Sequence, residues 1–261
     1  MKIAVCIKQV PTREWQPRID ELRRAVREQD ASFEMNEPDA YALEEALRLR
    51  EQHTGEVVVC TAGPARASQV LREALARGAD RAIHVEDDRL SSSDSSVVAL
   101  ALAEAVRDEK FDLVLTGLQS DDQGAAQTGV ILAERLGMPH ATIVMEVQVQ
   151  PSGSEGAPRV LRVKRELEGG WFQWVSLPLP ALLTIQSGIN QLRYATLKGI
   201  MAAKKKEIRK VASPAVPAAR VRIVSLDVPR KTKQTQMISG SASEAARGLI
   251  DKLKNEARVL A

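Results

Sequence analysis

The segment GLQSDDQGAAQTG, residues 117–129, joins glycines and small polar residues to an apolar, helix-like run. Such a loop presents free backbone N–H groups and the positive end of a helix dipole, and both favour an anion such as phosphate. The small residues Gly124, Ala125 and Ala126 would let a ligand approach the backbone closely, and Thr128 offers a hydroxyl. The loop is therefore a candidate phosphate site.

The same loop matches neither of the common nucleotide-binding motifs. It is not followed by the Gly-Lys-Ser/Thr of a Walker A sequence, and the dinucleotide pattern GxGxxG is absent from the chain. Spacing alone therefore leaves a second interpretation equally open, in which Asp121 or Asp122 only caps the following helix.

The other reactive residues are scattered. His53, His84 and His140 lack the spacing of metal ligands, which predicts no dedicated metal site. Cys6 and Cys60 lie inside apolar, strand-like runs, where reduced and buried thiols are expected. No Ser, His and acidic residues cluster at strand ends, and no GxSxG nucleophile elbow occurs, so hydrolytic chemistry finds little support.

Composition is that of an ordinary globular protein, with 44% hydrophobic and 27% charged residues in a chain of 261. No apolar run approaches the ~20 residues of a membrane helix, and the N-terminal MKIAVCIKQV resembles neither a secretory signal nor a transit peptide. We therefore expect a cytoplasmic protein that is not embedded in a membrane. The net charge of +3 is unevenly distributed, because residues 198–233 carry +9 and leave −6 for the rest.

Up to residue 140, strand-like and helix-like segments alternate. The strand-like segments are continuous apolar runs, which is typical of a parallel sheet covered by helices on both faces. We predict an α/β fold in which strands at 2–10, 56–62, 81–85 and 111–116 alternate with helices at 39–52, 66–77, 94–109 and 124–136.

After Pro139 this alternation gives way to four strand-like segments with short connections, which we expect to extend the sheet with antiparallel strands. The chain between 187 and 240 lacks a periodic core pattern, and it predicts a loop, a short helix and an extended arm. The four strands are predicted at 142–150, 159–166, 171–177 and 182–186, and two amphipathic helices at 19–28 and 242–258.

In an open parallel sheet, ligands bind beyond the carboxyl ends of the strands. Four segments fall at or beside such ends: Val10-Pro11, residues 36–39, residues 62–64 and residues 117–128. The predicted topology therefore favours this edge of the sheet as the ligand site.

The segment YATLKGIMAAKKK places Leu197, Ile200 and Met201 beside three consecutive lysines at 204–206. An apolar anchor with a basic rim suits a protein partner with an acidic surface, since the anchor supplies affinity and the charges steer the encounter. A nucleic acid is disfavoured, because Tyr194 is the sole aromatic residue between 187 and 240 and stacking platforms are missing. A solubilising lysine run at a helix end is the alternative.

Several separate segments resemble one protein family, in the same order along nearly the whole chain. The most specific is VKRELEGGWFQWVSLPLPALLT at 163–184, with a basic residue, an acid before two glycines, a glutamine, and a proline before an apolar run that ends in threonine. NQLRYATLKGIMAAKKK at 190–206, VCIKQVP, MNEPDAYALEEALRL, ARGADRAIHV and the 117–129 loop match as well. The chain resembles the beta subunits of electron transfer flavoproteins.

This resemblance implies an electron carrier subunit without a reaction of its own, built on a nucleotide-binding sheet like that of the adenine nucleotide alpha hydrolases. Its partner would be an alpha subunit that holds most of a redox-active FAD, while this chain carries a buried AMP. The heterodimer would take electrons from acyl-CoA dehydrogenases or related flavoproteins and pass them to a membrane quinone reductase.

The resemblance also assigns residues to the AMP site. Backbone amides at 124–128 would hold the phosphate, and the region of Asn36 would hold the base or ribose. The implied AMP residues are Cys6, Asn36, Glu37, Pro38, Asp39, Ala62, Gly117, Gln119, Ser120, Asp121, Asp122, Gln123, Gly124, Ala125, Ala126, Gln127 and Thr128.

Residues 191–206 resemble the family's partner-recognition loop and helix, and Leu197 matches the residue that inserts into a hydrophobic pocket of the dehydrogenase. Residues 1–190 would form the nucleotide-binding domain, and 207–261 an arm and helix that pack on the alpha subunit. The loop after Val10 would contact the flavin. The implied partner-binding residues are Tyr194, Leu197, Ile200, Met201, Lys204, Lys205 and Lys206, and the flavin-contact candidates are Arg13 and Trp15.

Three alternatives stay open. Electron-bifurcating members of the family carry a second FAD in place of AMP, with a loop close to DGDTAQVGP, whereas DDQGAAQTG with Thr128-Gly129 favours AMP. A nucleotide hydrolase or ligase would need a Ser-Gly-Gly-x-Asp loop after the first strand, which Val10-Pro11-Thr12 lacks. A stress-type nucleotide-binding module would be shorter and would not need residues 187–261.

Overall fold

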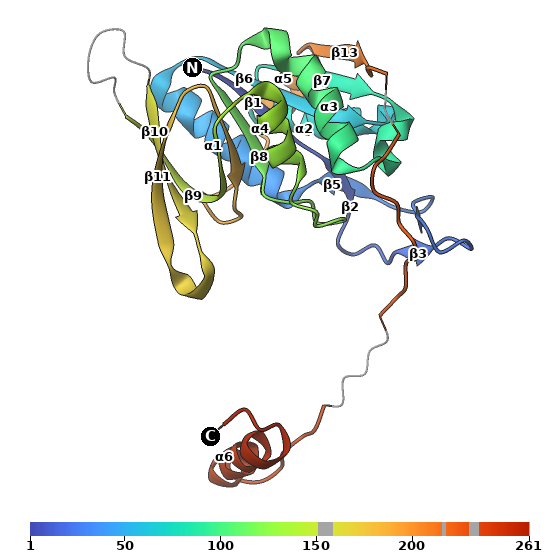
Figure 1. Cartoon of the computed structure of the whole chain (residues 1–261), viewed down its shortest axis with the longest axis vertical. Helices are drawn as coiled ribbons and strands as arrows, with labels where there is room; N and C mark the ends of the chain where they lie inside the picture. The colour runs from blue at the N-terminus through green and yellow to red at the C-terminus, as the bar shows by residue number, and fades with distance from the viewer. Residues whose placement is uncertain (151–158, 216–217, 230–234, 261) are drawn as a thin grey trace.

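The computed structural model describes residues 1–150, 159–215, 218–229 and 235–260. Its centre is a nine-stranded sheet in the order β11-β10-β9-β12-β8-β1-β6-β7-β13 (Figure 1). The strands are β1 (Lys2–Cys6), β2 (Gln9–Pro11), β3 (Arg18–Ile19), β4 (Val26–Arg27), β5 (Phe33–Met35), β6 (Glu56–Gly63), β7 (Arg81–Glu86), β8 (Leu113–Gly117), β9 (His140–Gln150), β10 (Val160–Glu166), β11 (Phe172–Pro178), β12 (Ala181–Ile185) and β13 (Ile208–Ala212).

Helices cover both faces of the sheet, α1 and α2 on one face and α3 and α4 on the other. Successive residues of a central strand enter the two cores in turn: Val57 and Val59 of β6 lie in the first, and Val58 and Cys60 in the second. A strand buried on both sides must be apolar throughout, which explains the continuous apolar runs. The helices are α1 (Glu37–His53), α2 (Ser68–Arg77), α3 (Ser95–Val106), α4 (Thr128–Leu136), α5 (Leu197–Ala203) and α6 (Ala242–Asp251).

Strand β12 corrects the prediction of four antiparallel strands. It runs parallel to both neighbours, with Leu182 opposite Val114 of β8 and His140 of β9. Strand β10 is antiparallel to β9 and to β11, so the chain reverses twice before β11 ends. The antiparallel extension is therefore the β10–β11 hairpin, and β12 is an interior strand buried along its whole length.

The helix predicted at 19–28 is wrong, because this segment forms the β3–β4 hairpin. The Asp20 carboxylate accepts hydrogen bonds from the N–H groups of Arg24 and Ala25 at 2.7 and 2.9 Å, which closes the turn. Side-chain bonds of this kind compete with helix formation. Leu22 is 75% exposed, so no core rewards an amphipathic helix here.

Two other predicted boundaries shift near the strand ends. The strand expected at 2–10 stops after Cys6, and the chain then leaves the sheet to pair β2 with β5. The helix expected from 124 begins at Thr128, so the preceding residues form an irregular loop. Both changes lengthen the loops at the carboxyl edge of the sheet.

Strand β13 was not predicted. It pairs parallel with β7 at the edge of the sheet, and Arg209 and Lys210 form ion pairs with Glu109 and Glu86 at 2.7 and 2.6 Å. Residues 208–212 of the expected arm therefore belong to the sheet. The chain then leaves the body, and Figure 1 shows α6 standing apart from the sheet. Among the described helices, none has the length and apolar character needed to cross a membrane.

Candidate functional site

A cavity opens at the carboxyl ends of β1, β6 and β8. Its wall is formed by Cys6 of β1, the start of α1, the turn after β6, a serine-rich segment at 91–95 and the loop at 116–129. These segments are distant in sequence, and the parallel topology brings their strand ends to one edge. Cys6 and Cys60 are free, buried thiols as expected, and burial raises the pKa of the Cys6 thiol.

The N-terminus of α4 meets this cavity at Thr128, and no side chain caps it. The two acids proposed as caps are engaged elsewhere: Asp122 Oδ1 lies 2.7 Å from Lys8 Nζ, and Asp121 Oδ2 lies 3.5 Å from a guanidinium nitrogen of Arg13. The capping interpretation is therefore wrong. The uncapped N–H groups of the first turn are available to an anion.

The buried side chain of Asn36 holds the 117–128 loop through two hydrogen bonds. Its Nδ2 donates to the carbonyl oxygen of Gln119 at 3.0 Å, and its Oδ1 accepts the N–H of Asp121 at 2.9 Å. Both ends of the amide are thus bonded to the backbone of the loop. The predicted contact of this region with a base or ribose stays a prediction.

Asp39 joins the end of β1 to the end of β8. Its Oδ2 accepts the N–H of Lys8 and its Oδ1 that of Gly117, each at 2.8 Å. Burial raises the pKa of Asp39 to about 7, while these two N–H donors act in the opposite direction. A carboxyl group that titrates near neutral pH therefore holds two strands of the site together.

Gly117 and Gly129 occupy positions where no side chain fits. A Cβ at 117 would lie 2.5 Å from Asp39 Oδ1, and a Cβ at 129 would lie 2.6 Å from Thr116 Oγ1 and 2.8 Å from Thr184 Cγ2. The loop and the first turn of α4 therefore lie directly against the strands, because these two residues have no side chains.

Four residues implied for the AMP site do not line the cavity: Glu37, which pairs with Arg13, and Pro38, Asp121 and Gly124. The others do, and they come from β1, β6, β8, the start of α1 and the 117–128 loop. They are Cys6, Asn36, Asp39, Ala62, Gly117, Gln119, Ser120, Asp122, Gln123, Ala125, Ala126, Gln127 and Thr128.

Sequence reasoning missed two basic residues of the wall. Lys8 lies two residues after the end of β1, a position that the strand-end argument could have found. Arg66 lies beyond β6, pairs with Glu28 at 2.5 Å and stacks 4.3 Å from the ring centroid of Phe33. Both partners of Arg66, Glu28 and Phe33, belong to a segment without a clear periodic pattern, so no sequence signal indicated this contact. Other lining residues not singled out are Ile7, Gln9, Glu28, Ala67, Leu90, Ser91, Ser93, Ser95, Val98, Leu102 and Thr116.

Comparison with known proteins identifies the family of this chain. Residues 24–216 match the model of the electron transfer flavoprotein domain. The electron transfer flavoprotein subunit beta of Methylophilus methylotrophus is 40% identical over 261 residues, which cover 96% of this chain and 97% of that protein. The chain belongs to the beta-subunit family of electron transfer flavoproteins.

Other members of the family lie in bacteria and in plant mitochondria. The mitochondrial subunit beta of Oryza sativa subsp. indica is 38% identical over the full length of both chains, and that of Bacillus subtilis is 32% identical over 90% of this chain and 91% of that one. The family resemblance drawn from the sequence is thus confirmed, as is the mainly parallel fold with an antiparallel hairpin. The cytoplasmic location stays a prediction.

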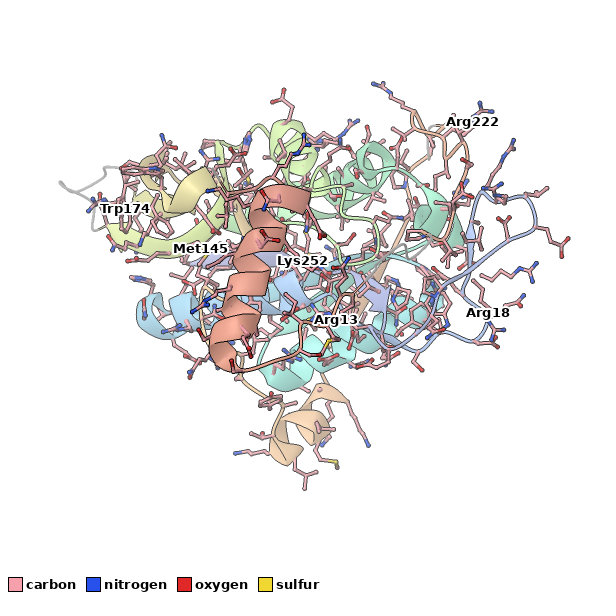
Figure 2. All side chains as sticks on the ribbon, turned by 90° about the horizontal axis from the view of Figure 1, so that it is seen from below. Arg13, Arg18, Met145, Trp174, Arg222 and Lys252 are labelled. Atoms are coloured by element: carbon pink, nitrogen blue, oxygen red, sulfur yellow. The ribbon has the colours of Figure 1, made fainter. Side chains whose placement is uncertain are left out.

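In this electron transfer flavoprotein beta subunit, the expected recognition segment is a loop followed by α5. Tyr194 and Leu197 are 89% and 81% exposed, and Ile200 and Met201 are exposed as well. Thr196 caps the helix, since its Oγ1 accepts the N–H of Gly199 at 3.0 Å. Figure 2 shows the light orange helix α5 projecting from the lower side of the molecule.

The loop before α5 is tied to α1 by Arg193. Its guanidinium bonds both carboxylate oxygens of Glu44 at 2.8 and 2.9 Å and reaches Glu51 at 2.6 Å. Asn190 adds a bond from Nδ2 to Glu45 Oε2 at 3.0 Å. Glu44 and Glu45 are buried, so two acids of α1 serve to hold the recognition loop.

The three predicted partner-binding lysines do not share one environment. Lys204 and Lys205 are exposed, but Lys206 Nζ donates to the carbonyl oxygens of Leu75 and Ala79 at 3.2 and 2.5 Å. Burial lowers the pKa of Lys206. The prediction is therefore corrected for Lys206, whose amino group binds the end of α2 and does not face outward.

Proposed function

We propose that this chain is the beta subunit of a heterodimeric electron transfer flavoprotein that binds AMP in the cavity at the carboxyl edge of its sheet. The observation that carries the nucleotide part is the uncapped N-terminus of α4 at the cavity wall. The neighbouring helix α3 shows the contrast, because Asp94 accepts the N–H groups of Ser96 and Val97 at 3.0 Å. A phosphate would accept hydrogen bonds from the free N–H groups in the first turn of α4, as the Asp94 carboxylate does in the first turn of α3.

The remaining wall suits the other parts of AMP. The serine hydroxyls at 91, 93 and 95 and the side chain of Gln127 offer polar partners for a ribose. Leu90, Val98 and Leu102 supply apolar surface for a base. The two acids within the loop, Asp121 and Asp122, are each paired with a cation, so the loop does not present their negative charges unpaired to a phosphate.

The electron-transfer part of the proposal places no reacting group on this chain. FAD, held mainly by an alpha subunit, would supply the redox chemistry. This chain would position the heterodimer against its electron donors. The donors would be acyl-CoA dehydrogenases or related flavoproteins, and the acceptor a membrane quinone reductase. Leu197 would be the anchor that enters a donor pocket, and the exposed Lys204 and Lys205 would steer the encounter.

The alpha subunit would be bound through the part of the arm that leaves the body. Helix α6 begins with a capping box between Ser241 and Glu244 and exposes Leu249 and Ile250. An apolar helix face that meets no core of its own is expected to pack on another chain.

The experiment is to express this chain with its alpha subunit and to count nucleotides in the purified dimer. We expect equal amounts of AMP and FAD. A second FAD in place of AMP would overturn the AMP assignment and favour the electron-bifurcating alternative. The donor part is tested by Leu197→Ala, which should raise the KM for the reduced dehydrogenase roughly tenfold with unchanged flavin content. Leu22→Ala, at a similarly exposed leucine of the β3–β4 hairpin, is the matched control.

A further inference from the structure

Helix α5 is too short to hold its own shape. It has seven residues, and isolated helices below about 12 residues are marginal in water. Most of its apolar side chains point outward, so its pose depends on the few contacts that it makes with the body. The strongest of these contacts lie along α2.

Helices α2 and α5 cap each other reciprocally. A guanidinium nitrogen of Arg72, on α2, donates to the carbonyl oxygens of Ala203 and Lys206 at 2.6 and 2.8 Å, at the C-terminus of α5. In return, Lys206 Nζ donates to the carbonyl oxygens of Leu75 and Ala79 at the C-terminus of α2. Each cation lies where unpaired carbonyls and the negative end of a helix dipole attract it.

The contact between the two helices is close. A Cβ at Gly199 would lie 2.3 Å from the carbonyl oxygen of Ala76, so this glycine permits backbone to meet backbone. Ala203 is buried at the same contact. The reciprocal caps thus stabilise a close contact between α2 and α5 that Gly199 and Ala203 make possible. Leu197 lies at the N-terminal end of α5 and is positioned by this contact.

We propose that Arg72 and Lys206 are positioning residues for donor docking, which fix α5 so that Leu197 is presented in one pose. This inference rests on the proposed role of Leu197 as donor anchor. A preorganised anchor binds more tightly, because the cost of ordering it is met before the partner arrives. Lys206 acts through α2, whereas the adjacent Lys204 and Lys205 act on the donor through solvent.

The test compares Lys206→Met with Lys205→Met in the assembled dimer. Both variants remove one positive charge from the same lysine run, but only Lys206 bonds α2. The first measurement is the KM for a reduced acyl-CoA dehydrogenase at low and high ionic strength. Lys206→Met should raise the KM roughly fivefold at both ionic strengths, because it alters geometry. Lys205→Met should raise it about twofold at low ionic strength only, because screening removes steering.

The second measurement is hydrogen exchange of the amides at 200–203, which needs no donor. Lys206→Met and Arg72→Met should each speed this exchange roughly tenfold, Arg72→Lys less so, and Lys205→Met not at all. Unchanged exchange in Lys206→Met and Arg72→Met would overturn the positioning role, as would a KM effect that high salt abolishes. If Leu197→Ala left donor kinetics unchanged while the exchange rates rose as expected, the proposed donor anchor would fail and the reciprocal capping would stand.

Discussion

The nucleotide cavity and the recognition helix are both held in place by hydrogen bonds from polar side chains, but these side chains attach them to the fold differently. At the cavity, Asn36 and Asp39 are buried and bond the backbone of strands and loops within the central sheet. At α5, Arg72, Arg193 and Lys206 reach across the surface to hold a seven-residue helix. A change in the cavity should therefore alter the stability of the whole fold, whereas a change at α5 should alter one local pose.

Substitution of Gly129 should have the largest effect on global stability. Gly129→Val places side-chain atoms where a Cβ alone would already lie 2.6 Å from Thr116 Oγ1. Because overpacking of this kind costs typically 1–3 kcal/mol, we expect a loss of about 3 kcal/mol in the free energy of unfolding, together with loss of bound AMP. Urea unfolding and nucleotide content measure the two effects.

Gly124→Ala is the matched control for this prediction. Gly124 lies in the loop that leads into α4, at a positive φ of 60° and with open space around its Cβ position. An alanine there should cost only about 1 kcal/mol of backbone strain and leave AMP in place. Equal losses in the two variants would show that the close approach at Gly129 does not support the site.

Gly199→Ala should have a smaller effect on stability and a selective effect on docking. In an ordinary helix this change stabilises by about 1 kcal/mol. Here the new Cβ would meet the backbone of Ala76, so α5 must shift outward, and we expect a net loss of about 1 kcal/mol. The KM for the donor should rise while AMP content stays constant. Coupled loss of AMP would contradict the separation of the two regions.

The sequence predicted the cavity better than the recognition helix for a physical reason. In a parallel sheet the carboxyl ends of β1, β6 and β8 must share one edge, so strand order alone gathers Cys6, Ala62 and Gly117. Lys206 is the converse case. Three adjacent lysines look alike in sequence, and only the tertiary contact with α2 distinguishes the one that is bonded inward.

The errors in the predicted fold also arise because tertiary contacts cannot be read from the local sequence. The β3–β4 segment carries a helical apolar pattern, but no core lies beneath Leu22, and Asp20 closes a turn instead. The apolar run predicts a strand at 182–186, but the direction of β12 depends on the course of the chain before it. Local pattern identifies an element, while packing partners decide its form and direction.

The smallest expected effect is a pH dependence confined to the cavity. The pKa of Asp39 is raised by burial to about 7 from an ordinary value of 3.8, so between these values the native chain binds a proton that the unfolded chain has released. Stability therefore falls as the pH rises through this window. Between pH 6.5 and 7.5 the native carboxyl group carries about half a proton on average and the unfolded one almost none, so the free energy of unfolding falls by about 0.7 kcal/mol over this interval.

Asp39→Asn should remove this pH dependence, since the amide does not titrate. Asp112→Asn is the control, because Asp112 also accepts a backbone hydrogen bond, from Lys2, at the opposite end of β1. Urea unfolding at pH 6.5 and 7.5 should give the same slope in Asp112→Asn as in the unsubstituted chain and a flatter slope in Asp39→Asn. Hydrogen exchange in α5, corrected for its intrinsic pH dependence, should remain constant in all three, because no contact of α5 with α2 involves Asp39. If the free energy of unfolding of Asp39→Asn still fell between pH 6.5 and 7.5 as in the unsubstituted chain, a group other than Asp39 would release the proton. The pH dependence would then not distinguish the cavity from the recognition helix.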